Sequence, residues 1–181
     1  MPSRKFDVCM LTENSFQGDS RILREARSVA GSGLDVLLLA LHNPGVTAPV
    51  EDVGGFRVQR IAVWSRRLGV RWALVVKSLE FLIRITLRAL RSGARIFHAH
   101  HPIALIPGAI AAKVLGAKLI YDCHELAIAM PGDSSIRRRV IKTYEGLLLR
   151  FVDHVIMSDG AFRATVFRDA HSYDKPITYL Y

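Results

Sequence analysis

Residues 94–125 decide the fold of this chain: they read ARIFHAHHPIALIPGAIAAKVLGAKLIYDCHE. Two short apolar segments, typical of buried strands, stand on either side of a segment typical of a helix. Titratable side chains follow each strand: His98, His100 and His101 after the first, and Asp122, His124 and Glu125 after the second. In an open parallel α/β sheet, the carboxyl ends of the strands face the crevice in which ligands bind. The sequence therefore predicts a functional site where these two strands end.

The rest of the chain repeats the alternation of strand and helix. We expect strands over residues 5–12, 35–41, 55–63, 96–100, 118–123, 154–157 and 176–181, and helices over 19–30, 72–90, 104–115, 135–150 and 160–168. Residues 42–55 are rich in Pro and Gly, which indicates a loop. Strands that alternate with helices at this spacing form βαβ units. The sequence thus predicts an α/β fold, a Rossmann-like doubly wound parallel sheet of about seven strands, in a single domain over residues 1–181.

The charge of the chain indicates an anionic partner. Lys and Arg number 25 against 16 Asp and Glu, which gives a net charge of +9. Such an excess suits nucleic acid, an anionic membrane or a phosphorylated substrate. Aromatic residues make up 8% of the chain and are not interleaved with the basic runs. Because no stacking platform is visible, we do not expect a nucleic-acid partner.

The cysteines and the amino terminus indicate a cytoplasmic protein. Cys9 and Cys123 both fall within predicted buried strands, which favours reduced thiols over a disulfide or a metal knuckle. Residues 1–14 have a basic start but no sustained apolar stretch or cleavage pattern, so we expect no signal peptide.

The segment over residues 72–90 has about the length of a membrane span, but four charged residues interrupt it at helical spacing: Lys77, Glu80, Arg84 and Arg88. An amphipathic helix fits better than a spanning one. Two interpretations remain open. In the first, the helix packs on the sheet and exposes one charged stripe to solvent. In the second, it also rests on a membrane surface through Trp72 and the basic residues Arg66, Arg67 and Arg71.

Two kinds of bound group are not expected. The loop after the first strand contains Gly18 but lacks the G-x-G-x-x-G of dinucleotide-binding folds. Three histidines with Asp122 or His124 make a zinc site conceivable. No cysteine and no spaced histidine pair on a helix supports such a site, so we expect no metal.

Four stretches, in this order, resemble motifs of one enzyme family. Asp19-Ser-Arg-Ile-Leu-Arg-Glu-Ala-Arg, with the later Gly33-Leu-Asp-Val, is similar to its "D-x-R-V-x-R-E-A" and "G-H-x-V". Ile96-Phe-His-Ala-His-His is similar to "V-V-H-A-H-D", Leu119-Ile-Tyr-Asp-Cys-His-Glu to "L-V-Y-D-x-H-E", and Asp153-His-Val-Ile-Met-Ser-Asp-Gly to "A-D-x-V-I-x-x-S-E-G". The chain thus resembles the N-terminal half of the retaining glycosyltransferases of family 4, which have the two-domain GT-B fold.

The resemblance implies transfer of a sugar from a nucleotide-sugar donor to an acceptor hydroxyl, on a glycan or a lipid-linked molecule, with retained anomeric configuration. It implies that this half holds the acceptor, that a C-terminal half absent from this sequence holds the donor, and that no cofactor is needed. A different interpretation also stands: a non-catalytic half-subunit that docks on a separate donor-binding partner or anchors it to a membrane. We expect a cytoplasmic protein. If residues 72–90 also contact a membrane surface, we expect the protein to rest on the inner face of the cytoplasmic membrane.

The resemblance also implies roles for residues in the titratable cluster. The family histidine matched by His124 lies near the transferred sugar, and an imidazole suits that position. Asp122, two residues earlier, orients an imidazole or binds a backbone amide. Glu125 contacts the acceptor or begins a helix. His100 or His101 lines the acceptor cleft, whereas packing at the strand end is the leading interpretation of His98.

Three further residues are candidates for substrate binding. Arg21 meets a phosphate or carboxylate bidentately, or lies solvated on the outer helix face. Asn14, in the loop after the first strand, lies where the donor would approach. Ser158 caps the following helix or helps to hold a phosphate or sugar hydroxyl.

Overall fold

The computed structural model describes residues 5–67, 73–123, 135–158 and 160–180, with only the backbone of residues 66–67, 73, 135–138, 158, 160–163 and 180. The strands are β1 (Val8–Leu11), β2 (Val36–Leu41), β3 (Val50–Val53), β4 (Phe56–Ile61), β5 (Ile96–Ala99), β6 (Lys118–Cys123), β7 (His154–Ser158) and β8 (Ile177–Leu180). The helices are α1 (Ser20–Gly31), α2 (Ala73–Ser92), α3 (Pro102–Leu115), α4 (Ser135–Leu149) and α5 (Gly160–His171), with a short 3₁₀ turn, η1 (Trp64–Arg67).

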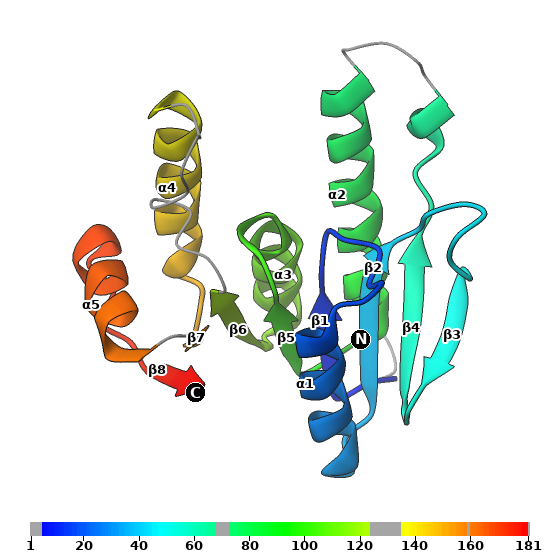
Figure 1. The fold of residues 1–181 in the computed structure, drawn as a ribbon, viewed down its shortest axis with the longest axis horizontal. Coiled ribbons are helices and arrows are strands. Elements are labelled where there is room, and N and C mark those ends of the chain that lie inside the picture. The colour runs from blue at the N-terminus through cyan, green and yellow to red at the C-terminus, as the bar shows by residue number, and fades with distance from the viewer. Residues whose placement is uncertain (1–4, 68–72, 124–134, 159, 181) are drawn as a thin grey trace.

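The described strands form one sheet in the order β3-β4-β2-β1-β5-β6-β7-β8, and every neighbouring pair is parallel except β3 and β4. The order reverses between β1 and β5, which is the point where doubly wound sheets bind ligands. The predicted α/β class and Rossmann-like sheet are therefore confirmed (Figure 1).

The strand count was too low by one, because residues 42–55 are not all loop. Val50–Val53 pairs antiparallel with β4 through a two-residue turn at Gly54 and Gly55. Both glycines have positive φ, 60° and 96°, a conformation that glycine adopts without steric cost and that such hairpin turns require.

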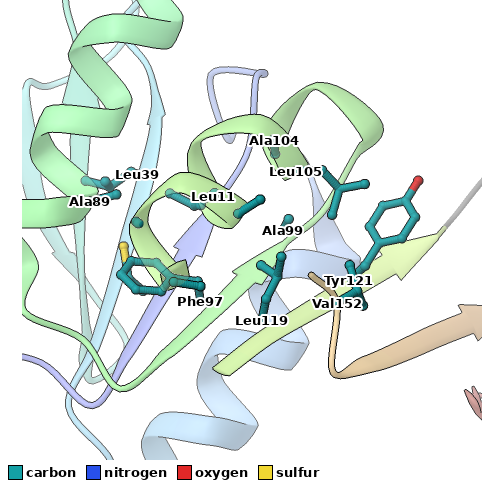
Figure 2. Packing of buried hydrophobic residues seen from close by; sticks show 14 of the residues in the cluster. Leu11, Leu39, Ala89, Phe97, Ala99, Ala104, Leu105, Leu119, Tyr121 and Val152 are labelled. Atoms are coloured by element: carbon teal, nitrogen blue, oxygen red, sulfur yellow. The ribbon is translucent and has the colours of Figure 1, made fainter. Parts of the chain in front are cut away.

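Alternate strand residues separate two apolar layers. Val8 and Met10 of β1 belong to the cluster beneath α1, whereas Cys9 and Leu11 belong to a larger cluster that includes buried side chains of α2 to α5. Figure 2 shows part of this larger layer, with Leu11, Phe97, Leu119 and Tyr121 from the strands packed below α3 and its Leu105. The helices thus cover the sheet on both faces.

Helix α3 approaches the sheet closely at Gly108. A Cβ atom there would lie 2.9 Å from Cδ1 of Leu119 and 3.3 Å from Cδ1 of Leu11. The helix begins with Pro102 at its first turn, where the missing N–H leaves no hydrogen bond unmade, and ends at Gly116, with φ of 63°. The residue just before this helix, His101, is thereby held at the carboxyl edge of the sheet.

Among the described residues, no helix has both the length and the apolar character needed to cross a membrane.

Candidate functional site

A buried polar cluster lies where β5 and β6 end, on the face of the sheet that α1 covers. The register pairs His98 of β5 with Ile120 of β6, so two residues further on His100 comes beside Asp122. The His98 and His100 rings pack together with centroids 4.2 Å apart. Nδ1 of His100 lies 3.4 Å from Oδ2 of Asp122. His98 and His100, two residues apart along the chain, therefore lie on the same face of the sheet.

Helix α1 completes this cluster with an arginine and a glutamate. The Asp19 side chain accepts a hydrogen bond from the Ile22 amide and caps the helix, which fixes where the first turn lies. From that turn, Nη2 of Arg21 donates to Oδ1 of Asp122 at 2.6 Å, and its Nε donates to Oε1 of Glu25 at 2.9 Å. The second oxygen of Glu25 lies 3.6 Å from Nδ1 of His100. One guanidinium thus bridges two carboxyl groups that both face the same imidazole.

The two carboxyl groups titrate near neutral pH. Burial raises the pKa of Glu25 to about 7; the nearby Asp122 charge adds to the rise and Arg21 opposes it. Burial also raises the pKa of Asp122 to about 6, and Arg21 opposes that rise. Oxygen atoms of the two carboxyl groups lie within 4.8 Å of each other. Because like charges at this distance disfavour double ionisation, the pair retains a proton at mildly acidic pH.

The end of β6 is also held from the opposite face. The Tyr121 hydroxyl donates to Oε1 of Glu145 in α4 at 2.6 Å. Oε2 of the same carboxyl lies 3.2 Å from Nε2 of His171 in α5, and both side chains are almost fully buried. Burial raises the pKa of Tyr121 well above its usual value, so the phenol stays protonated as a donor. Polar contacts on both faces therefore fix the strand that leads directly to residue 124.

A second polar pair and a pocket lie at the same edge, on the α2 side. Nδ1 of His101 is 3.8 Å from Oε1 of Glu13, and burial raises the pKa of Glu13, while His101 opposes the rise. Next to this pair is a pocket of about 260 Å³. Its lining is mainly apolar, with one acidic and two polar or basic side chains: Glu13, Leu41, Val63, Lys77, Ser78, Phe81 and Ile103.

The other predicted site residues have different surroundings. Asn14 shapes the loop after β1: its Nδ2 donates to Asp19 and its Oδ1 accepts from the Phe16 amide. Ser158 is the last residue of β7, and its side chain lies outside the described part. His124 and Glu125 also lie outside the described residues, as do Trp72 and Arg71 and the side chains of Arg66 and Arg67. The roles predicted for these residues stay predictions.

A metal ion is one group that the cluster could hold. Glu25, His98, His100 and Asp122 each offer a ligand atom within 4.8 Å of the others, and imidazole with carboxylate is a common zinc ligand set. Arg21 already supplies positive charge to both carboxyl groups. The guanidinium therefore offsets one of the two carboxylate charges when both groups are ionised.

Sequence reasoning missed the part that Glu25 plays in this cluster. Glu25 stands four residues after Arg21, a spacing that places both side chains on one helix face, and it belongs to the quoted R-E-A stretch. The available signal was this spacing. Arg21 also pairs with Asp122 of β6, which is 101 residues away along the chain. No local sequence pattern indicates that contact.

These features define a class of protein: a Rossmann-like domain with a buried polar cluster at the carboxyl ends of its central strands. A family model described as "Glycosyl transferase 4-like domain" matches residues 19–179. The chain belongs to this family. No curated protein sequence matches it.

Solved structures show the same fold. Two structures of sucrose-phosphate synthase from Thermosynechococcus elongatus superpose with TM-scores of 0.68 and 0.73 at 14% identity, covering 96% of this chain. Alr3699/HepE from Anabaena, in complex with UDP and glucose, gives a TM-score of 0.62 at 14% identity over 97% of this chain. This chain covers 87% of the shorter synthase chain, but only 47% of the longer one and 44% of HepE. It thus spans about half the length of these larger proteins and has the fold of a GT-B half.

Proposed function

We propose that this chain is the acceptor-binding half of a retaining glycosyltransferase that uses a nucleotide-sugar donor. The observation that carries the proposal is the arrangement at one sheet edge: a buried network fixes the end of β6, and a partly apolar pocket opens beside it. Family membership supports the reaction class. HepE has been solved with UDP-glucose and with UDP and glucose, which supports a nucleotide sugar as donor.

The pocket suits an acceptor that has both polar and apolar parts. Leu41, Val63 and Phe81 provide an apolar floor, and Glu13 and Lys77 offer charged groups that hydrogen-bond sugar hydroxyls. Carboxylate and ammonium groups bind hydroxyls through charge-assisted hydrogen bonds, which are stronger than neutral ones. The acceptor in this proposal is a glycan or a lipid-linked sugar.

The residues after β6 would act on the donor sugar. In the proposed reaction the bond from the anomeric carbon to the donor phosphate oxygen breaks, and the diphosphate leaves with the electron pair. The acceptor oxygen bonds to that carbon, and the proton of the acceptor hydroxyl passes to the leaving phosphate. His124 would hydrogen-bond the sugar at the reacting centre. Asp122 is fully buried and bound by Arg21, so we assign it a positioning role through the strand end. Glu125, His101 and Ser158 would contact the substrates.

A binding experiment tests the division of labour. The chain should bind octyl glucoside, a sugar with an apolar tail, in calorimetric titrations, and should bind neither UDP nor UDP-glucose. It should also transfer no glucose from UDP-glucose. Rapid transfer by the chain alone, or tight binding of UDP-glucose, would contradict the assignment of the donor to another half.

Two isoleucines of α3 provide a matched pair of variants. Ile103 lines the pocket and Ile110 does not, yet both side chains are 44% exposed. Ile103→Gln should weaken octyl glucoside binding several-fold, because a polar amide replaces apolar contact, whereas Ile110→Gln should leave binding unchanged. Equal effects of the two substitutions would show that the ligand binds elsewhere.

A further inference from the structure

Helix α2 carries two apolar stripes on opposite sides. Phe81, Ile85 and Ala89 are buried against the sheet, whereas Leu79, Ile83 and Leu87 are exposed. Each set repeats every four residues, so each forms one stripe along the helix. The sets are offset by two residues, which is about 200° around the helix axis at 3.6 residues per turn. The exposed stripe therefore faces directly away from the core.

The exposed stripe continues to the beginning of the helix, where Leu74, Val75 and Val76 are also exposed. We call these three residues with Leu79, Ile83 and Leu87 the α2 outer face. The first half of α2 projects past the carboxyl ends of the strands (Figure 1). By contrast, α1 exposes polar residues such as Ser20, Arg24 and Arg27. A contiguous exposed apolar surface bordered by polar side chains is typical of an interaction surface.

Basic side chains flank the α2 outer face on one side. A groove of about 650 Å³ runs between α2 and the end of β4, and Arg84, Arg88 and Arg91 line it together with Leu79 and Ile83. Among the described residues, Glu80 is the carboxylate paired with Arg84, and no described carboxylate lies within ion-pair distance of Arg88 or Arg91. The groove thus combines apolar contact with two arginines available for an anion.

Contacts with α2 hold an exposed tryptophan beside this groove. The Glu80 carboxylate accepts hydrogen bonds from the backbone amides of Trp64 and Ser65 at 3.0 and 2.9 Å. The Arg84 guanidinium lies 4.2 Å from the centre of the indole ring, while 71% of Trp64 remains exposed. An indole with one apolar body and one polar N–H suits the boundary between lipid and water.

We propose that the α2 outer face, with Trp64 and the arginines beside it, docks on an anionic lipid bilayer. Apolar side chains would enter the boundary of the acyl chains, and Arg88 and Arg91 would meet lipid phosphates at the level of the headgroups. The net charge of +9 adds long-range attraction to such a surface. A second copy of the chain is a poorer occupant, because two such faces would bring their arginines together.

Vesicle binding tests this proposal without any sugar substrate, so its outcome is independent of the proposed enzymatic function. The probe is vesicles of equal parts phosphatidylcholine and phosphatidylglycerol, with pure phosphatidylcholine vesicles for comparison. The chain should sediment with the anionic vesicles and bind the neutral ones at least tenfold more weakly. The chain has two tryptophans, so Trp72→Phe leaves Trp64 as the only indole. Its fluorescence should shift to the blue on anionic vesicles.

Paired substitutions distinguish vesicle binding through the α2 outer face from non-specific binding by exposed apolar residues. Leu79→Gln with Ile83→Gln should reduce vesicle binding at least tenfold, and Arg88→Gln with Arg91→Gln should do the same. The control is Ile110→Gln with Val114→Gln, a pair on α3 with the same spacing of four residues and similar exposure. It should bind vesicles as the parent chain does. Circular dichroism and thermal unfolding verify that all variants are folded.

Three results would overturn the proposal. The first is no vesicle binding by the parent chain, and the second is equal binding by the α2 variants and the α3 control. The third is concentration-dependent self-association without vesicle binding, lost on substitution of Leu79 and Ile83, which would show that the outer face pairs with another copy.

Discussion

Replacing Arg21 by methionine tests the electrostatic description of the buried cluster. Methionine keeps the apolar stem of the side chain and removes the guanidinium, which bridges Asp122 and Glu25 at 2.6 and 2.9 Å. Two carboxyl groups would then share one region without a cation. We expect Arg21→Met to destabilise the fold, and to do so more at high pH than at low pH.

The expected magnitude follows from the two hydrogen bonds. Removing one partner of a buried charged pair costs about 3–5 kcal/mol, and hydrogen bonds to charged groups contribute about 1.5–3 kcal/mol each. Because 23% of the Arg21 side chain is exposed, water replaces part of the loss. We therefore expect a loss of about 3 kcal/mol in the free energy of unfolding at pH 8. For a chain of this size, that lowers Tm by about 6–12 °C.

The pH dependence has a defined sign. The folded pKa values of Glu25 and Asp122, about 7 and 6, lie above their ordinary values of 4.5 and 3.8. Groups with raised folded pKa values contribute most to the stability of the folded chain when they are protonated. This contribution is complete below about pH 4 and is lost as the pH rises through 6 and 7. Without Arg21 the folded pKa values of both carboxyl groups rise further. The variant therefore loses more stability than the parent chain over this pH range. At pH 5 the deficit should shrink to about 1 kcal/mol, the value of neutral hydrogen bonds.

Urea unfolding at pH 5 and pH 8 measures both quantities. Arg57→Met is the control, because Arg57 pairs with Asp52 at the surface, where both side chains are more than half exposed. Such pairs contribute about 0–1 kcal/mol, so this variant should change stability little and equally at both pH values. An Arg21→Met deficit that is the same at pH 5 and pH 8 would refute the reasoning.

Three other expectations concern stability and reactivity. Gly108→Ala should cost about 1–2 kcal/mol in urea unfolding, because a Cβ atom 2.9 Å from Leu119 overpacks the core, whereas Gly31→Ala, with open space around it, should be neutral or stabilising. Asp19→Ala should cost about 1 kcal/mol through loss of the α1 cap, and a fully native midpoint would contradict the capping role. Burial raises the pKa of the Cys9 thiol to about 12, so Ellman's reagent should modify it only after unfolding, and rapid modification of the folded chain would disprove its burial.

The sequence predicted the central sheet well, because its strands are continuous apolar runs that end at glycines or polar clusters. Residues 36–41 and 118–123 are examples, and both lie within the predicted ranges. The strand β3 was missed because its sequence, VEDV, is short and places two acidic residues between two valines at an exposed edge. Such a segment has little burial to reveal it. The Gly54-Gly55 pair between two short segments that contain valines was the signal for a hairpin.

Strand parity carried the prediction of the site. It placed His98 with His100 on one face of their strand, and Asp122 with His124 on one face of the next strand. That His100 lies beside Asp122 was seen only in the structure. The partnership of Arg21 with Asp122 could not be predicted, because it depends on how α1 lies across the sheet. Local periodicity identifies which face of a helix is apolar, but not which distant strand its polar residues meet.

The helix α2 joins the pocket to the outer surface. Lys77 and Phe81 line the pocket, while Leu79 and Ile83, within one helical turn, belong to the α2 outer face. A small rotation or shift of this one helix would change both environments together. If an amphiphile on the outside changes the affinity of a ligand within the pocket, thermodynamic reciprocity requires the ligand to change the affinity of the amphiphile by the same factor.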